Sequence, residues 1–182
     1  MQFLTIIEDV NNKIGKHENI SKWCKDHGIL IRRQKLNVGD YALTPSIVVD
    51  TKFGMAEIYS DIVSDHERFR NECLRAQEDG IKLVILIESE DITSLEEAKR
   101  WKNPRITQYE RTYGLVLRAQ KAGKMLDKKI PKPPVPSERL VGMMEAMTMK
   151  YGVIFTFCHP RNTGEEVYRI LTGGESQLLK NS

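Results

Sequence analysis

The residue types best suited to chemistry lie in a short stretch near position 50. Residues 48–52 read Val-Val-Asp-Thr-Lys, a composition typical of a β-strand. Alternate side chains of a strand project from the same face, so Asp50 and Lys52 place a carboxylate beside an amine. An isolated pair of this kind is more often an ion pair on an exposed strand, and the surrounding residues must decide between the two interpretations.

A second carboxylate reaches the same point if residues 41–44 and 47–53 form a hairpin. A three-residue loop at 44–46 would pair position 40 with position 50, so that Asp40 lies opposite Asp50. Two adjacent carboxylates repel each other and are costly to remove from water unless a cation compensates them. Their oxygens favour a hard divalent ion; Mg²⁺ fits best, and Mn²⁺ is expected to substitute. Such an ion beside an amine favours hydrolysis of a phosphodiester without a covalent intermediate.

The elements that must position these residues follow from hydrophobic periodicity. Short apolar runs alternate with amphipathic segments, which predicts a mixed α/β fold. Residues 83–88 are apolar on both faces, as expected of a central strand. Ser64, Ser137 and Thr163 are expected to begin helices as N-terminal caps. Strands are predicted at 3–8, 29–34, 41–44, 47–53, 83–88 and 153–157, and helices at 17–27, 64–80, 105–122, 137–151 and 163–171.

Composition excludes several classes of protein. The 182 residues are 40% hydrophobic, which predicts one domain with a substantial core and excludes a disordered or collagen-like chain. The longest apolar run covers only residues 83–87, too short to cross a membrane, and the first residues show no secretory pattern. Cys24, Cys73 and Cys158 lack the spacing of a disulfide framework, so reduced thiols and a cytoplasmic location are expected.

Positive charge is concentrated in one segment. Residues 99–139 hold twelve Lys or Arg and three Asp or Glu, a net charge of +9, whereas the other residues carry −6 and the whole chain +3. This split predicts a basic arm on a neutral-to-acidic body, a common footprint of binding to a phosphate backbone. Residues 128–136 contain four prolines, so residues 91–136 are expected to be an insertion in a single domain of residues 1–182. The alternative is a solvated helix face followed by a lysine-rich loop.

The region around the two aspartates resembles a known nuclease family. Residues 38–45 (VGDYALTP) and 48–52 (VVDTK) are similar to the G-D-Y and V-E-R-K motifs of the XPF family of structure-specific endonucleases, within the PD-(D/E)xK superfamily. Residues 6–9 (IIED) resemble the family's first strand, which ends in a catalytic aspartate. Arg68 and Glu72 stand where the family has an arginine and, four residues later, a glutamine. The resemblance implies an α/β, restriction-endonuclease-like fold, a mixed central sheet flanked by helices.

The same resemblance implies an activity and a set of roles. The expected activity is that of a Mg²⁺-dependent endodeoxyribonuclease that cleaves branched or junction DNA, with a role in DNA repair or recombination. A homodimer or a protein partner, and the cytoplasm of a bacterial or phage-infected cell, are also expected. The implied catalytic residues are Asp9, Asp40, Asp50 and Lys52, and the metal ligands are Asp40, Asp50 and the backbone carbonyl of Thr51, with Glu57 as a further candidate. Arg68 and Glu72 would contact DNA, and the basic segment would add Arg105, Arg111, Lys124, Lys128, Lys129 and Lys132.

Several positions depart from the family pattern. Asp50 replaces the glutamate of V-E-R-K, and Asn11-Asn12 stand where the family usually has R-E. The acid expected four residues after the lysine falls on Ala56, with Glu57 adjacent. No tandem helix-hairpin-helix module follows the domain in this sequence. These departures leave a second interpretation open, a non-catalytic DNA-binding or scaffold protein on the same fold.

Overall fold

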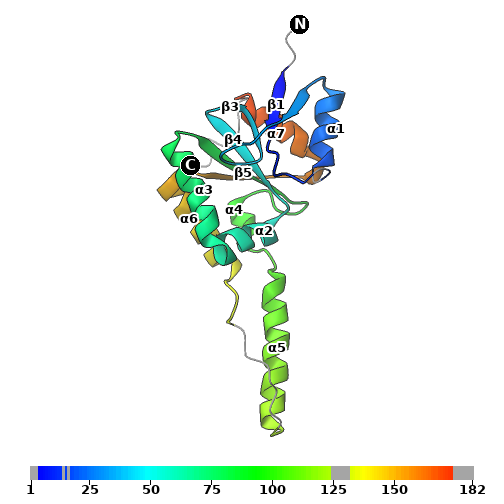
Figure 1. Ribbon diagram of the computed structural model, residues 1–182. Helices are drawn as coiled ribbons and strands as arrows, with labels where there is room; N and C mark the ends of the chain where they lie inside the picture. The colour runs from blue at the N-terminus through cyan, green and yellow to red at the C-terminus, as the bar shows by residue number, and fades with distance from the viewer. Residues whose placement is uncertain (1–3, 14, 16, 124–131, 174–182) are drawn as a thin grey trace.

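A six-stranded sheet forms the centre of the molecule (Figure 1). The computed structural model describes residues 4–13, 15, 17–123 and 132–173. The strands are β1 (Thr5–Glu8), β2 (Leu30–Arg33), β3 (Tyr41–Thr44), β4 (Ile47–Lys52), β5 (Lys82–Glu88) and β6 (Ile154–Cys158). The longer helices are α1 (Glu18–Asp26), α3 (His66–Glu78), α5 (Pro104–Lys121), α6 (Ser137–Tyr151) and α7 (Thr163–Leu171). Shorter turns are α2 (Met55–Tyr59), η1 (Ser60–Ser64), α4 (Leu95–Ala98) and η2 (Pro160–Asn162).

The sheet is mixed, as predicted. Its order is β2-β1-β3-β4-β5-β6; β1 pairs antiparallel with β3 and β3 with β4, and the other neighbours are parallel. The predicted hairpin is confirmed, because Tyr41 pairs with Val49 and Ala42 with Val48. The predicted three-residue loop is wrong, because Thr44 pairs with Ile47 and a register shift separates this pair from Ala42. One residue further along, the Asp40 amide donates to the Val49 carbonyl at 2.8 Å. Asp40 thus lies just before the paired residues of β3, beside Val49, and its carboxylate reaches Thr51 on β4.

Strand β5 is buried on both faces, which confirms the prediction of a central strand. Its Leu83, Ile85 and Ile87 pack into the core beneath α3 and α6. Val84 and Leu86 point the other way, into the core beneath α1 and α7. Figure 1 shows these two helix pairs on opposite sides of the sheet.

The register with β5 decides which face carries the chemical groups. Asp50 pairs with Ile85 and Lys52 with Ile87 in the parallel ladder. Paired residues of a ladder project from the same face, so both side chains lie on the side covered by α3. Val49 lies in the opposite core, beneath α1 and α7.

The three predicted helix caps are wrong in detail. Ser64 ends a π-helical turn, and α3 begins at His66 without a side-chain cap. The Ser137 hydroxyl donates instead to the carbonyl of Trp101, and the Thr163 hydroxyl donates to Glu88 Oε1 at 2.6 Å. The hydroxyls of Ser137 and Thr163 thus connect segments that are distant in the sequence. Such contacts cannot be predicted from sequence spacing.

Helix α5 extends away from the body of the molecule (Figure 1). Asn103 caps its first turn, and the Arg105 guanidinium lies 4.5 Å from the centre of the Tyr59 ring and donates to Ser60 Oγ. Tyr113, Leu115 and Leu117 are exposed further along it. Among the described residues, no helix is both long and apolar enough to span a bilayer.

Candidate active site

A cavity of about 440 Å³ opens between α3, the end of β4, and the segments that follow β1 and precede β3. Five acidic and three basic side chains line it. Most were singled out by the sequence, although they come from separate segments of the chain. The charged lining residues are Asp9, Asp40, Asp50, Glu57, Glu72, Lys52, Arg68 and Arg75.

Asp40 is held in place by the opposite strand of the hairpin. Its Oδ2 accepts a hydrogen bond from the Thr51 amide at 3.0 Å and another from the Thr51 hydroxyl at 2.7 Å. The same hydroxyl lies 3.0 Å from His17 Nε2. The carboxylate therefore has a fixed orientation, and His17 belongs to its surroundings although no sequence pattern indicated this.

Gly39 permits the close approach that this arrangement needs. Its φ of +68° is in the left-handed region, and a Cβ would stand only 2.3 Å from Val48 Cγ1. Its amide donates to Glu72 Oε1 at 3.1 Å. The glycine thus allows the start of the hairpin to contact the middle of α3.

Lys52 lies between two buried carboxylates. Its Nζ is 2.8 Å from Asp50 Oδ2 and 2.9 Å from Asp61 Oδ2, and each of the three side chains is less than a tenth exposed. Burial alone would lower the pKa of Lys52, but the charges of Asp50 and Asp61 outweigh it and raise the pKa. Lys52 is therefore a fixed cation. Asp61, in η1, is a site residue that the sequence analysis missed.

Burial raises the pKa of Asp50 well above its usual value. The charge of Lys52 opposes this rise, whereas the carboxylates of Asp40 and Glu72 add to it. The carboxylates of Asp40, Asp50 and Glu72 together thus carry more negative charge than Lys52 alone offsets. A cation beside Asp40 and Asp50 would relieve this repulsion.

Arg68 and Glu72 lie one turn apart on α3 and face the cavity. The Arg68 side chain is 60% exposed, and its Nη2 donates to Asp61 Oδ1. Its Nη1 stands 4.0 Å from Glu72 Oε2. Arg68 thus presents a tethered positive charge at the mouth of the cavity.

Asp9 and Glu57 complete the acidic lining. The Asp9 amide donates to the Asp40 carbonyl at 2.8 Å, and Asp9 Oδ1 accepts from the Asn11 amide at the same distance. Glu57 Oε2 accepts from the Phe53 amide at 2.7 Å. Both side chains border the cavity, and each already has a backbone partner.

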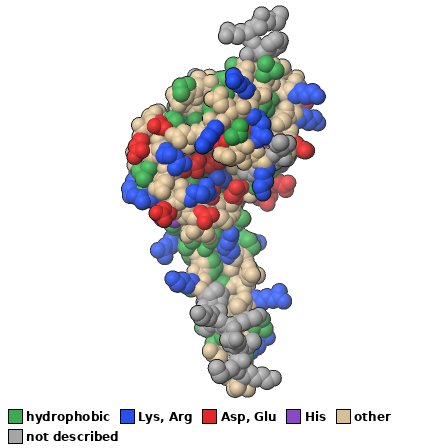
Figure 2. All heavy atoms as spheres, in the orientation of Figure 1, with side chains coloured by type: hydrophobic (Ala, Val, Ile, Leu, Met, Phe, Trp, Pro, Cys, Tyr) green, Lys and Arg blue, Asp and Glu red, His purple; other side chains and the backbone are tan. Residues whose placement is uncertain are grey.

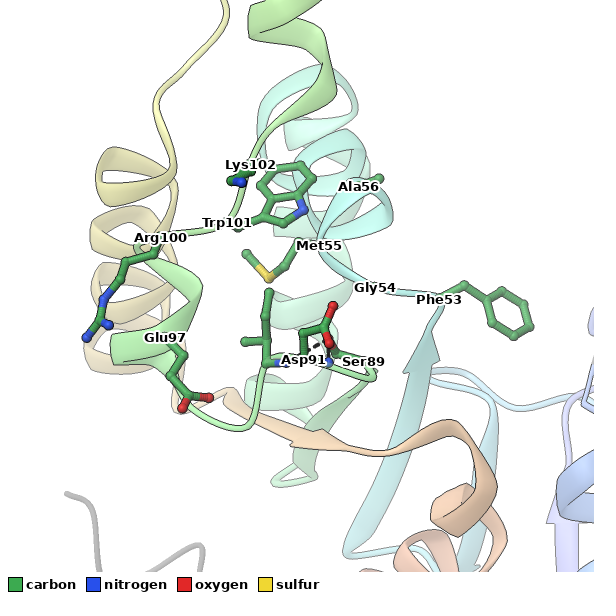
Figure 3. Close-up of a pocket in the computed structure, with 11 residues that line it drawn as sticks. Phe53, Gly54, Met55, Ala56, Ser89, Asp91, Glu97, Arg100, Trp101 and Lys102 are labelled. Atoms are coloured by element: carbon green, nitrogen blue, oxygen red, sulfur yellow. Dashed lines mark hydrogen bonds between the residues drawn. The ribbon is translucent and has the colours of Figure 1, made fainter.

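Ala56 belongs to a different cavity (Figure 3). This second space, of about 700 Å³, lies between the segment that follows β4 and the segment that precedes α5, and Met55 and Trp101 line it. An acid at position 56 would project there rather than beside Lys52. The carboxylate next to Lys52 comes instead from Asp61.

The predicted DNA-contacting residues of the basic segment are spread along the chain. Arg105 contacts Tyr59 and Ser60 at the base of α5, and Arg111 is exposed on the same helix. Lys132 is exposed, whereas Lys124, Lys128 and Lys129 lie outside the described residues. On the face shown in Figure 2, the charged side chains along α5 are basic, and the acidic ones gather on the body.

Comparison with protein families identifies the family to which this chain belongs. The family model described as "ERCC4 domain" matches residues 10–168, which contain Asp40, Asp50, Lys52 and all of α3. The chain belongs to the ERCC4 domain family. This confirms the resemblance to the XPF-type nuclease domain.

Solved structures agree with an ERCC4 fold. The chain is similar to "XPF from Aeropyrum pernix", with a TM-score of 0.56 and 14% identity, over 94% of this chain and 62% of that one. A second structure of that protein, "complex with DNA", gives the same TM-score and identity over 92% and 63% of the two chains. The chain therefore spans less than two thirds of the protein it matches. A comparison with curated protein sequences gives no match.

The donor set suits the divalent ion that nucleases of the ERCC4 family usually require. The carboxylates of Asp40 and Asp50 both line the cavity, which holds more acidic than basic groups. Hard ions such as Mg²⁺ take one or two carboxylates and complete their shell with water. In the part of the chain that the structure describes, no three His, Cys, Asp or Glu side chains form a ready metal cage. The residues therefore fit an ion held by two carboxylates, and not a closed structural site.

Proposed function

We propose that this ERCC4 domain is a metal-dependent endonuclease that hydrolyses phosphodiester bonds in branched or junction DNA. The cavity beside α3 carries the proposal, because Asp40, Asp50 and Lys52 all line it. Membership of the ERCC4 family and the likeness to an XPF protein that was solved with DNA support it.

Asp40, Asp50 and the carbonyl of Thr51 would hold Mg²⁺, or Mn²⁺ in its place. Such an ion polarises a phosphoryl oxygen and lowers the pKa of bound water. Asp9 or Glu57 would supply a further acid at the cavity wall.

Lys52 would orient the attacking water or stabilise the negative charge that develops on the phosphate. Its two carboxylate partners keep it protonated, so we assign it an electrostatic role and not that of a general base. Arg68 would contact a phosphate next to the cleaved bond, since its guanidinium is both exposed and tethered at the cavity mouth. Glu72 would orient Arg68 through their ion pair. It would also position the start of the hairpin by accepting from the Gly39 amide.

The basic segment would extend the DNA-binding surface beyond the cavity. Helix α5 carries Arg111 on an exposed turn, and exposed Lys132 follows on the return of the chain. Lys124, Lys128 and Lys129 would add further phosphate contacts. We also propose a homodimer or a protein partner, in line with the XPF resemblance.

The substitution Asp50→Asn tests the proposal. With Mg²⁺ present, we expect cleavage of flap, fork, bubble and linear DNA to fall by orders of magnitude. DNA affinity without metal should hold or rise, because a negative charge leaves the cavity. Asp26→Asn, the same chemical change at an exposed position of α1, is the matched control and should cleave as the wild type does.

A non-catalytic DNA-binding or scaffold protein is the alternative. Asn11 and Asn12, which stand where the family usually has R-E and line the cavity, favour it. Under this alternative the wild type binds DNA but cleaves none of the four substrates, and Asp50→Asn changes neither property. That result would overturn the proposed nuclease activity.

A further inference from the structure

Asp61 has no counterpart among the residues that the family resemblance pointed to, yet it contacts two cations of the site, Lys52 and Arg68. Its Oδ2 lies 2.9 Å from Lys52 Nζ, and its Oδ1 accepts from Arg68 Nη2. The side chain is only 6% exposed. The two oxygens thus join a buried cation to an exposed one.

The local backbone explains how Asp61 reaches this place. Residues Ser60–Ser64 form a π-helical turn between α2 and α3. Turns of this type widen a helix locally and are frequent at functional sites. Within this turn Asp61 and Ile62 are buried.

Asp61 stands behind Lys52 and not in the open cavity. Asp50, Lys52 and Arg68 line the cavity, whereas Asp61 is not among its lining residues. A metal ion in the cavity would therefore meet Asp50 and not Asp61. Asp61 is suited to act on the ion only through Lys52.

Of the two carboxylates beside Lys52, only Asp50 would contact an ion bound in the cavity. Asp50 faces both Lys52 and the cavity, so an ion would compete with Lys52 for its negative charge. A buried ammonium that lost its only partner would carry a large desolvation penalty. A second carboxylate, outside the reach of the ion, removes that penalty.

We propose that Asp61 is a positioning residue that holds Lys52 when Asp50 is engaged by a metal ion, and so allows the ion to bind. The inference rests on the proposed function, since it concerns the same metal site. It goes further by naming the carboxylate that pairs with Lys52 when a metal ion binds Asp50. Arg68, through the other oxygen, keeps the Asp61 carboxylate turned toward Lys52.

The test measures Mn²⁺ binding by calorimetry on the complete chain without DNA. Loss of an outer-shell partner typically weakens metal binding about 10- to 100-fold, and we expect Asp61→Asn to fall in that range. Asp65→Asn removes the same charge at an exposed position just after the π-helical turn, and should bind Mn²⁺ as the wild type does. Equal affinity of Asp61→Asn and the wild type would overturn the inference.

A double-mutant comparison separates positioning from simple loss of charge. A Lys52→Met background lacks the buried ammonium that competes with the ion for Asp50, so adding Asp61→Asn should change Mn²⁺ affinity by less than about 2-fold. A further drop of about 10-fold in that background would mean that Asp61 acts on the ion directly, and would overturn the proposed role. This comparison remains decisive if Asp61→Asn alone does not fold.

The outcomes also separate this inference from the proposed function. A wild type that binds no Mn²⁺ would contradict the metal-dependent nuclease itself. A wild type that binds Mn²⁺ and cleaves DNA, while Asp61→Asn keeps full affinity, would contradict only the role of Asp61.

Discussion

The carboxylate of Asp40 accepts two hydrogen bonds from Thr51, one from the backbone amide at 3.0 Å and one from the hydroxyl at 2.7 Å. Both reach the same oxygen, Oδ2, so the orientation of the group is set by the hairpin that carries its partner Asp50. A carboxylate held in this way needs little reorganisation when it binds an ion.

Thr51→Val tests this arrangement, because valine keeps the shape of threonine but removes the hydroxyl. We expect the free energy of unfolding to fall by about 1 kcal/mol, the usual net value of one hydrogen bond. Mn²⁺ affinity should fall about 10-fold, since Asp40 loses part of its support. Urea denaturation and calorimetry measure the two effects. Thr44→Val, at an exposed position of the same hairpin, is the control, and equal effects at the two positions would contradict the prediction.

Gly39→Ala should destabilise the fold far more than Gly80→Ala. Both glycines have a φ near +67°, but a Cβ at Gly39 would meet Val48 at 2.3 Å, whereas one at Gly80 would meet nothing within 4 Å. The left-handed backbone costs an alanine about 1 kcal/mol at either position, and the clash adds about 1 to 3 kcal/mol at Gly39. Chemical denaturation should therefore separate the two variants, and similar midpoints would argue against the close approach of β3 and β4.

The three cysteines should be unreactive in the folded protein. Each is buried, and burial raises the pKa of Cys24 to about 11 and those of Cys73 and Cys158 to about 12. At pH 8 we expect no reaction with a thiol reagent such as DTNB until guanidinium unfolds the chain, when all three should react. Because unfolded thiols ionise near pH 9, stability should be fully present below that pH and should decline as the pH rises toward 11. Rapid labelling of the native chain would contradict this burial.

Replacement of Lys124, Lys128, Lys129 and Lys132 by glutamine should weaken DNA binding and flatten its dependence on salt. Each lost phosphate contact reduces the slope of log K against log salt by about 0.9, so the four together could reduce it by about 3 to 4. Filter binding or anisotropy at several salt concentrations measures the slope. An unchanged slope would show that these lysines do not contribute to DNA binding. The roles proposed for the cavity residues would be unaffected.

Local patterns in the sequence determined most of the elements and the pairing at the centre of the site. The β-forming residues 47–52 and the turn before them predict the hairpin, which brings the Asp40 carboxylate to Thr51, next to Asp50. The unbroken apolar run at 83–87 predicts a strand covered on both faces. These features depend on neighbours within a few residues, so composition and spacing are sufficient to reveal them.

Contacts between distant segments were decided only by the tertiary structure. The Gly39 amide bonds a glutamate 33 residues away, and Thr163 bonds Glu88 across 75 residues. Asp61 reaches Lys52 because the backbone forms a π-helical turn just before α3, which helical periodicity does not indicate. Sequence spacing reports which face of an element a residue occupies, but the packing of one element on another selects which polar groups meet. For that reason the two aspartates and the lysine could be predicted from the sequence, and the residue that supports the lysine could not.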